Sequence, residues 1–422
     1  MTRRRDDAPG PARQPSGAAA MAPLSGVRVI DLTSTFMGPY LTMLMARMGA
    51  DVIKVEAPGG DVVRQIGRGR HPGMGPIFLA VNHGKRSIGL DLAAGPAREV
   101  LYRLIEGADV FVTNVRPAAL ARLRLTAEQL RGLNQGLVYC ALPGFGRAGP
   151  YRDRAAYDDV IQAASGFAAV QGGQAAPGYV RSVIADKTVA LMGLAAVNAA
   201  LFDRSRTGHG QVIEVPMFES MVSFLMLDQQ GGHVFDPPAG PTGYARTASP
   251  NRRPYATADG YLGVVVYTDR QWLAFFDLIG RPELAADPKF ATITSRTENV
   301  DELYGMLADV LPSRTTVQWL DALGGAGIPA QPVLTTDGLF ADPHAQAVGL
   351  FEPLTHPSEG DLILPRLPIL FGGAASAPVR GAPRLGEHAA EILREAGLGD
   401  AEIAHLADTG AVFGDLPGRP PA

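Results

Sequence analysis

The 422-residue sequence lacks several features that would quickly define its class. It holds one cysteine, Cys140, which excludes an intramolecular disulfide and a cysteine-based metal cluster. Its formal net charge of −4 offers no broad electrostatic basis for binding nucleic acid. No stretch approaches the roughly eighteen uncharged apolar residues of a membrane span, so we expect no membrane partner. The N-terminal residues carry arginines but no apolar signal-peptide core, so we expect a disordered tail over 1–22 and a cytoplasmic protein.

Common catalytic signatures are also missing. The sequence has no G-x-x-x-x-G-K-[ST], no H-E-x-x-H and no G-x-S-x-G. The eight histidines are scattered without metal-ligand spacing, so we expect no bound metal. GFGRAG (144–149) matches G-x-G-x-x-G, but Pro150 follows it where a dinucleotide site needs an apolar helix, and we interpret it as a turn. The reactive group must then be an acid, a hydroxyl or a tyrosine.

The composition, 46% hydrophobic and 19% charged, supports large buried cores. Short apolar segments alternate with helical patterns over residues 23–228, which predicts an α/β fold with a doubly wound, Rossmann-like sheet in a large domain. The predicted strands cover 27–33, 51–56, 86–92, 109–114, 137–142 and 210–217.

The texture changes after residue 228. Glycine and proline dominate 229–254, which predicts a linker. A hairpin pattern and two amphipathic helices then predict a small α+β domain over 255–340. The last segment, 341–422, is expected to return to the large domain and to end in a C-terminal tail.

The stretch SVIADKTVALMGLAAVNAAL (182–201) reads as a buried helix with Asp186 and Lys187 as its only charges. Two interpretations of Asp186 compete. An aspartate is a preferred N-cap residue and suits the positive end of the helix dipole. A carboxylate that a helix terminus keeps ionised in a dry site can instead be reactive.

Several stretches together resemble the class III CoA-transferases, the superfamily of formyl-CoA transferase, carnitine CoA-transferase and α-methylacyl-CoA racemase. They run in order from about residue 23 to 400. They are PLSGVRVIDLTSTFMGPYLTMLMARMGADVIKVEAPGGD (23–61), NHGKRSIGLDL (82–92), ADVFVTNVRPAALARL (108–123), RTGHGQVIEVPMFE (206–219) and RLGEHAAEIL (384–393).

The resemblance implies a large Rossmann-like domain with a small domain, in a homodimer of interlocked chains. It makes Asp186 the nucleophile of an acyl-CoA:carboxylate CoA-transferase. A side-chain carboxylate suits this reaction, because a mixed anhydride and then an enzyme-bound thioester preserve the energy of the thioester. The expected partners are acyl-CoA, as substrate and not as a tightly bound cofactor, and a free carboxylic acid.

Tyr157 separates transferase from racemase. The racemase branch carries a histidine at the matching position as its second base, whereas transferases carry tyrosine. An unperturbed tyrosine titrates near ~10 and is a poor base at neutral pH. We therefore expect Tyr157 to line the active site as a hydrogen-bond donor, with an ordinary core tyrosine as the alternative.

The resemblance also implies residues along the CoA path. Asn114, Arg122, Leu90 and the loop Ser34, Thr35, Phe36 and Met37 match family positions that contact CoA. Ala57 and Ala155 stand where formyl-CoA transferase has basic residues, and Arg64 and Arg154 are candidates to replace them. The glycine-rich flap of that enzyme has no clear counterpart, which argues against oxalate or formate as the substrate.

Two other functions stay open at this point. One is an α-methylacyl-CoA racemase. The other is a non-catalytic acyl-CoA-binding homologue in which Asp186 only caps its helix.

Overall fold

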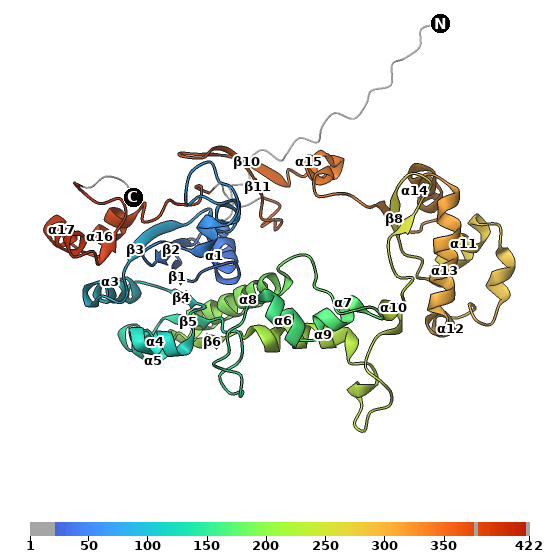
Figure 1. Cartoon of the computed structure of the whole chain (residues 1–422), viewed down its shortest axis with the longest axis horizontal. Coiled ribbons are helices and arrows are strands. Elements are labelled where there is room, and N and C mark those ends of the chain that lie inside the picture. Colours follow the sequence, from blue (N-terminus) through green and yellow to red (C-terminus); the bar gives the residue numbers. More distant parts are fainter. Residues whose placement is uncertain (1–21, 375–378, 419–422) are drawn as a thin grey trace, which may run out of the picture. The chain divides into compact units, whose positions relative to one another are not determined.

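The chain folds into two compact units (Figure 1). The computed structural model describes residues 22–374 and 379–418, so the predicted tail lies almost entirely outside the described residues. The first unit combines the chain up to Ala156 with Ala185–Met217 and the segment from Gly349 onward. The second unit consists of Tyr157–Ile184 and Phe218–Val348.

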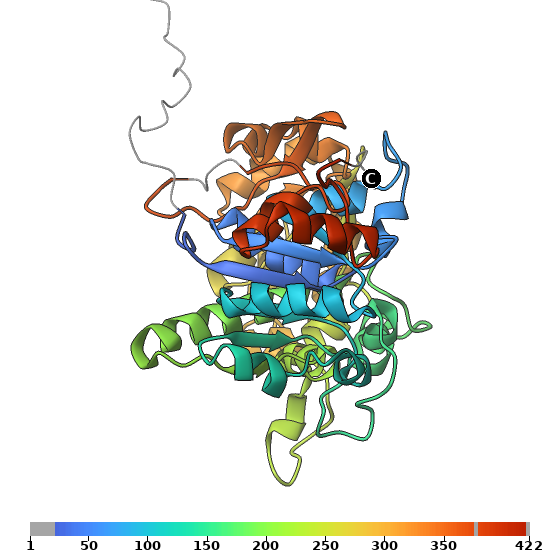
Figure 2. The ribbon, with the colours of Figure 1, turned by 90° about the vertical axis from the view of Figure 1, so that its left-hand side faces the viewer.

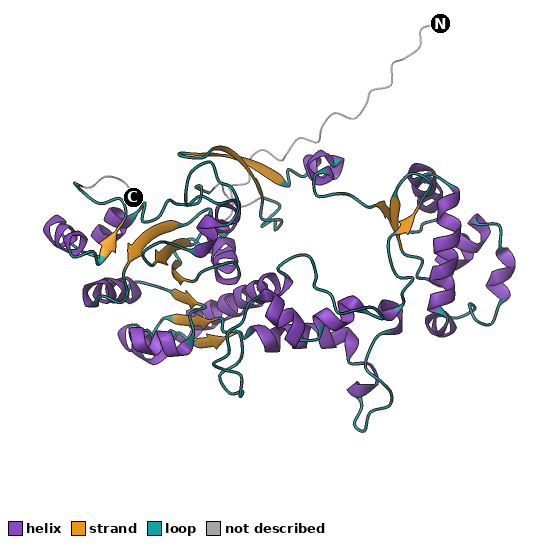
Figure 3. Ribbon diagram, viewed as in Figure 1, coloured by secondary structure: helices purple, strands orange, loops and turns teal. Residues whose placement is uncertain are grey.

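The first unit is built on a seven-stranded sheet of order β12-β3-β2-β1-β4-β5-β6 (Figure 3). All neighbouring strands are parallel except β12, which pairs antiparallel with β3. The predicted doubly wound sheet is therefore confirmed. Its strands are β1 Arg28–Leu32, β2 Asp51–Glu56, β3 Arg86–Leu90, β4 Val110–Thr113, β5 Val138–Ala141, β6 Val212–Glu214 and β12 Val412–Phe413. The same unit holds the hairpin of β10 Phe351–His356 and β11 Gly360–Pro365.

The two faces of this sheet differ in character. On one face, Ile30, Ile53 and Val55 join a large apolar cluster that includes residues of α3, α16 and α17 (Figure 2). Because side chains alternate along a strand, Asp31 and Lys54 point to the opposite face. The helices of the first unit are α1 Met37–Arg47, α2 Pro76–Asn82, α3 Gly95–Glu106, α4 Pro117–Leu123, α5 Ala127–Leu133, α8 Ile184–Thr207 (from Ala185), α16 Ala389–Glu395 and α17 Asp400–Asp408.

Helix α8 is the longest helix of the described residues and is the apolar helix predicted from the sequence. By length and composition it could cross a membrane, and 44% of its most apolar window is buried. Gly193 lies against α1: a Cβ atom there would stand 2.5 Å from Leu41 Cδ1. Helix α8 therefore approaches α1 so closely that a larger residue at position 193 would require the buried Leu41 side chain to move.

The second unit combines a small antiparallel sheet with helices. Its sheet has the order β7-β8-β9, and the predicted hairpin is the pair β7 and β8. The strands are β7 Tyr255–Ala256, β8 Tyr261–Val264 and β9 Ala330–Pro332. The helices are α6 Asp158–Ala164, α7 Phe167–Gly172, α9 Met217–Gln229 (from Phe218), α10 Ala245–Ala248, α11 Asp269–Leu278, α12 Ile293–Glu298, α13 Val300–Val310, α14 Thr316–Gly325 and α15 Pro343–Ala347.

The division of the chain departs from the predicted boundaries at three places. Residues 157–184 and 218–228, expected in the large domain, group with the second unit, and so does the predicted linker 229–254. The return to the first unit begins at Gly349 and not at residue 341. Helices α6, α7 and α9 carry apolar residues that fit either unit, so their pattern does not tell which unit they join.

Candidate active site

The crevice beside β1 and β4 is where a doubly wound sheet binds ligands. Successive strands add to one side of β1 up to β3, and the chain then returns to β4 on its other side. Such a reversal leaves an opening at the carboxyl ends of the strands. The loop Ser34–Phe36 follows β1 there, and Asn114 follows β4.

Asn114 ties these two strand ends together. Its Oδ1 accepts a hydrogen bond from the Ser34 amide at 3.1 Å, and its Nδ2 donates to the Ser34 carbonyl at 2.9 Å. Both backbone groups of Ser34 are thus fixed by one side chain. The structure brings together these two residues, which were predicted separately along the CoA path.

Asp186 lies in the first turn of α8 and is half-buried. The next residue, Lys187, has its Nζ 5.8 Å from the ring centroid of Phe36, a distance at which a cation is attracted to an aromatic face. The start of α8 therefore stands beside the loop that follows β1. An acid at a helix N-terminus is stabilised in its charged form.

A buried ionic network holds the loop that follows β1. Asp31 and Lys54 are direct neighbours in the β1–β2 register, and both are fully buried. Asp31 accepts hydrogen bonds from Thr33, Thr42 and the Lys85 ammonium, the last at 2.9 Å. Burial raises the pKa of Asp31, but the charges of Lys85 and Lys54 and the two hydroxyl bonds outweigh it and lower that pKa to about 2.

Asp61 extends the network to the loop itself. Its Oδ2 accepts from Lys54 Nζ at 2.9 Å, and its Oδ1 accepts from the Thr35 amide at 3.0 Å. Lys54 Nζ also donates to the Thr33 carbonyl at 3.0 Å. Burial lowers the pKa of Lys54, but Asp31 and the other nearby carboxylates outweigh it and raise that pKa.

The sequence reasoning missed this network. Its signal was present as single charged residues, Asp31 and Lys54, inside the apolar strands VIDL and VIKVE. A charged residue in a strand with both faces covered has to be paired, because an unpaired buried charge is strongly destabilising.

Arg122 lies exposed near the end of α4, within the helix that follows Asn114. A hollow beneath α4 is lined by apolar side chains of β5 and of the segments around α4, with Arg147 at its edge. Arg147 Nε pairs with Glu214 Oε2 at 2.5 Å. Because Arg122 itself is exposed, its guanidinium is available to an anionic ligand at the surface.

Two predicted CoA residues lie in the interior of the first unit. Leu90 is fully buried in the apolar cluster that α16 and α17 cover. Arg64 forms a two-pronged ion pair with Glu56, with both N···O distances 2.7 Å, and its guanidinium stacks 3.7 Å from the Phe78 ring centroid. Leu90 offers no exposed surface to CoA, and a contact between Arg64 and CoA would break its buried pair with Glu56. We therefore leave both residues out of the proposed site.

Tyr157 and Arg154 are both exposed. Tyr157 is the N-cap residue of α6 in the second unit, and 70% of its surface is accessible. This placement gives no support to the alternative of an ordinary core tyrosine. Arg154 belongs to the first unit, where its guanidinium lies 3.7 Å from the Tyr151 ring centroid.

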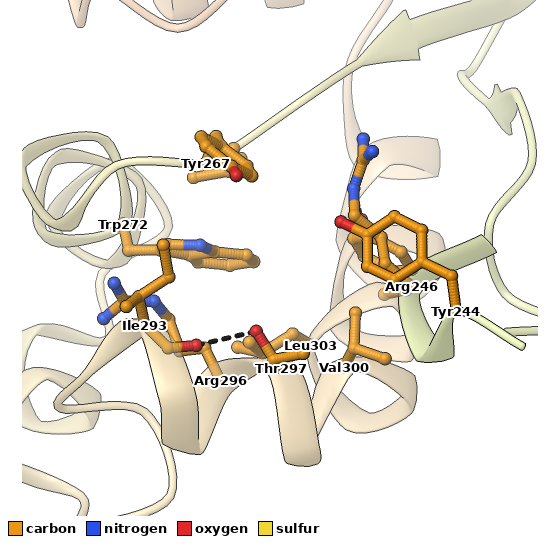
Figure 4. Close-up of a pocket in the computed structure, with 11 residues that line it drawn as sticks. Tyr244, Arg246, Tyr267, Trp272, Ile293, Arg296, Thr297, Val300 and Leu303 are labelled. Atoms are coloured by element: carbon orange, nitrogen blue, oxygen red, sulfur yellow. Dashed lines mark hydrogen bonds between the residues drawn. The ribbon is translucent and has the colours of Figure 1, made fainter. Parts of the chain in front are cut away.

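A second hollow lies within the second unit, lined by aromatic and basic residues (Figure 4). Arg246 Nε donates to the Tyr304 hydroxyl at 2.8 Å. The Thr297 hydroxyl donates to the Ile293 carbonyl at 2.8 Å, the bond drawn in Figure 4. None of the described residues that line this hollow is a carboxylate, a cysteine or a histidine. The hollow therefore holds hydroxyl groups but no carboxylate of the kind that the proposed reaction needs.

The described residues contain no group of three or more histidine, cysteine, aspartate or glutamate side chains that could hold a metal ion. The candidate nucleophile predicted from the sequence is Asp186, in the first turn of α8. A doubly wound α/β fold with an acid near its switch point fits an enzyme that handles nucleotide-linked substrates through a carboxylate.

Comparison with known proteins gives the family. The model described as CoA-transferase family III matches residues 24–389, so the chain belongs to this family and is a class III CoA-transferase. The chain is 34% identical to a succinate–glutarate CoA-transferase of Agrobacterium fabrum over 401 residues, which cover 88% of this chain and 95% of that protein. It is 33% identical to a formyl-CoA:oxalate CoA-transferase of Streptomyces avermitilis over 415 residues, 92% and 99% of the two chains.

The solved structures agree with this assignment. A CaiB/BaiF family protein from Brucella suis superposes with a TM-score of 0.75 at 32% identity, and the match covers 90% of this chain and 100% of that one. The family acts on CoA thioesters and carboxylic acids, which confirms the predicted enzyme class.

Proposed function

We propose that this enzyme transfers CoA between carboxylic acids through covalent intermediates on Asp186. The observation that carries the proposal is the position of Asp186 in the first turn of α8, with its neighbour Lys187 beside Phe36 at the carboxyl end of β1. The helix terminus favours the ionised carboxylate that the reaction needs.

The reaction begins with attack of the Asp186 carboxylate on the thioester carbonyl of the acyl-CoA donor. The carbon–sulfur bond breaks, CoA leaves as a thiolate, and a mixed anhydride forms. The thiolate then attacks the aspartyl carbonyl of the anhydride, which releases the donor acid as a carboxylate and leaves an aspartyl-CoA thioester. The acceptor carboxylate attacks the aspartyl carbonyl of this thioester, the carbon–sulfur bond breaks, and CoA thiolate leaves as a second mixed anhydride forms. The thiolate then attacks the acceptor's acyl carbonyl in this anhydride, which gives the new acyl-CoA and releases Asp186 as a carboxylate.

We assign the CoA path to the crevice between β1 and β4. Ser34, Thr35, Phe36 and Met37 line its start, and Asn114 fixes Ser34. Arg122 supplies an exposed guanidinium for a phosphate of CoA. Tyr157 and Arg154, both exposed, stay in the proposal as candidate residues for contact with substrate.

A homodimer in the cytoplasm is part of the same proposal. Exposed apolar side chains on α8 and α9 support a partner chain: Phe202 is 67% exposed and Leu227 is 86% exposed. Size-exclusion chromatography with light scattering tests this part, and a monomeric mass at micromolar concentration would contradict it.

The test of the nucleophile compares Asp186→Asn with Asp186→Ala. Asp186 is the third residue of α8, which begins at Ile184, so it lies in the first turn and is not the N-cap residue. Asparagine keeps its size and its capacity for hydrogen bonds in that turn, and it loses the nucleophile. We expect Asp186→Asn to lose at least about 1,000-fold in turnover with little change in thermal stability. Turnover is measured with succinyl-CoA and a panel of free acids that includes glutarate and oxalate, taken from the names of the relatives.

Two controls sharpen this test. Asp400→Asn removes another first-turn aspartate, on α17, which pairs with Arg394 on α16, and should leave turnover unchanged. Hydroxylamine added with acyl-CoA should trap a hydroxamate at Asp186 in the wild type, as located by peptide mass spectrometry. Near-normal turnover of Asp186→Asn, after a check for deamidation, would leave Asp186 with only a structural role in the first turn of α8. A protein that binds acyl-CoA but traps nothing would be the non-catalytic homologue.

A further inference from the structure

Thr35 has an unusual backbone conformation for its residue type. Its φ is +74°, in the left-handed region that β-branched residues rarely adopt. Such strain persists only where the surroundings fix it. Thr35 immediately precedes Phe36, whose ring lies beside Lys187.

The group that fixes Thr35 is a buried carboxylate. Asp61 is the N-cap of the short 3₁₀ helix η1 (Val62–Gln65), and its Oδ1 accepts from the amides of Val63 and Thr35. Its own amide donates to Glu56 Oε2 at 3.1 Å. Lys54 Nζ holds the other oxygen, Oδ2, at 2.9 Å.

Both partners of this ion pair are buried, with side chains 0% and 1% exposed. A buried ion pair adds little net stability compared with an apolar pair of the same volume, because desolvation offsets the attraction. The pair nevertheless fixes the direction of both Asp61 oxygens, and one of them points at the strained turn. Its effect is therefore geometric.

We propose that Asp61, oriented by Lys54, is a positioning residue that holds the Thr35 turn and so sets Phe36 against the start of α8, where Asp186 lies. This inference rests on the proposed function of Asp186. Neither Asp61 nor Lys54 touches the reacting atoms. They act through the backbone amide of Thr35.

The chemistry of the carboxylate provides a sharp test. Both Asp61 oxygens accept from donors, so Asp61→Asn places an amide NH₂ against either Lys54 Nζ or the two backbone amides in any orientation. One bond must break, and we expect the turn to shift. A misplacement on the order of 1 Å can cost about 100-fold in rate. We therefore expect kcat to fall about 10- to 100-fold, with the KM for acyl-CoA within about threefold of wild type.

Rescue separates positioning from simple loss of structure. In Asp61→Asn combined with Lys54→Gln, the new glutamine carbonyl oxygen can accept from the new amide, which restores the pairing without charge. We expect this double variant to recover most of the lost kcat. Asp342→Asn, at another N-cap aspartate whose side chain accepts a backbone amide, that of Ala345 at 2.8 Å, is the matched control and should keep near-normal turnover.

Thr35→Pro covers the case in which Asp61→Asn does not fold. Proline removes the amide that Asp61 binds and cannot reach φ +74°, while the half-exposed loop leaves the core intact. We expect the same loss of kcat as in Asp61→Asn. Wild-type kcat in either folded variant, or no recovery in the double variant, would overturn the inference.

Hydrogen exchange keeps this result distinct from the fate of the proposed function. The Thr35 amide should exchange at least about 10-fold faster in Asp61→Asn than in wild type, and slow again in the double variant. If the wild type transfers no CoA, the proposed function fails and exchange alone decides the claim about the turn. Equal exchange in wild type and Asp61→Asn would then overturn that claim.

Discussion

The close approach of α8 to α1 predicts a measurable cost of adding one methyl group. Gly193→Ala places a Cβ atom 2.5 Å from Leu41 Cδ1 and 3.3 Å from Leu142 Cδ2, where carbon atoms normally stay about 3.5–4.0 Å apart. Overpacking a buried site typically costs about 1–3 kcal/mol. Alanine gains about 1 kcal/mol over glycine in a helix. The free energy of unfolding of the first unit should therefore fall by up to about 2 kcal/mol.

A matched control isolates the steric part. Gly132 lies in α5 of the same unit, exposed, with no atom within 4 Å of an added Cβ. Gly132→Ala should gain up to about 1 kcal/mol from helix propensity alone. Tryptophan fluorescence does not report on this unit, because both tryptophans, Trp272 and Trp319, lie in the second unit. Amide hydrogen exchange of β1 and α8 under mild denaturant measures the loss. If Gly193→Ala is as stable as Gly132→Ala, the inference that α8 packs too closely on α1 for a side chain at position 193 is wrong.

Three further predictions concern the site and its support. Arg122→Ala should raise the KM for acyl-CoA more than it lowers kcat, because a phosphate contact is mostly uniform binding, and an unchanged KM would place Arg122 in solvent only. The enzyme should wash no deuterium into the α-position of a 2-methylacyl-CoA in D₂O, since Tyr157 is a poor base, and clear exchange by mass spectrometry would favour the racemase. Asp31 is more acidic folded than unfolded, so its ionised form stabilises the fold above about pH 4, and this contribution disappears as the pH falls towards 2. The stability advantage of wild type over Asp31→Asn should shrink by about 2 kcal/mol over that range in urea titrations, and a constant difference would contradict the reasoning.

The parallel sheet was predictable because its strands are short, apolar and separated by helical periods. Every strand from β1 to β6 falls within a predicted segment. The remaining strand of this sheet, β12, was not predicted, because its two residues, Val412 and Phe413, are too few to show a periodic pattern. Its pairing with β3 depends on Gly89, which leaves room for the Phe413 ring where a Cβ would stand 2.3 Å from it.

The sequence pattern did not predict at which residues the chain passes from one unit to the other. The segment 157–184 interrupts the first unit before α8 begins, and both of its short helices belong to the second unit. Apolar residues at helical spacing show that a helix has a buried face, but they do not identify the surface that buries it. The stretch 229–254 was predicted as a linker because glycine and proline dominate it, and it groups with the second unit. It holds the short helix α10, and Arg246 there bonds to Tyr304 on α13.

The residues of the candidate site differ in whether the sequence could predict their role. Asp186 was accessible to sequence reasoning because a lone acid before a long apolar helix stands out, and the family resemblance gave it a role. Arg64 was not, since a basic residue near a proposed phosphate site looks free until its partner is known. Glu56, eight positions earlier, accepts from two nitrogens of its guanidinium. Burial raises the pKa of Glu56, but its bonds and ion pair with Arg64 outweigh burial and leave that pKa below its ordinary value.

The two faces of the large sheet explain why the sequence predicted the apolar core but not the buried ionic network. Ile30, Ile53 and Val55 contribute to an apolar cluster whose stability grows with buried area, and such residues are recognisable one at a time. Asp31 and Lys54 alternate with them on the other face, where each charge is tolerable only because a partner meets it. Asp31 meets Lys85, 54 positions further along the chain, and Lys54 meets Asp61 in the loop after its own strand. That partnership is a property of the tertiary structure. The face of the sheet that carries the charges is also the face whose contacts hold the loop at the proposed site, so the least predictable packing lies beneath the residues with the most direct proposed role in transfer.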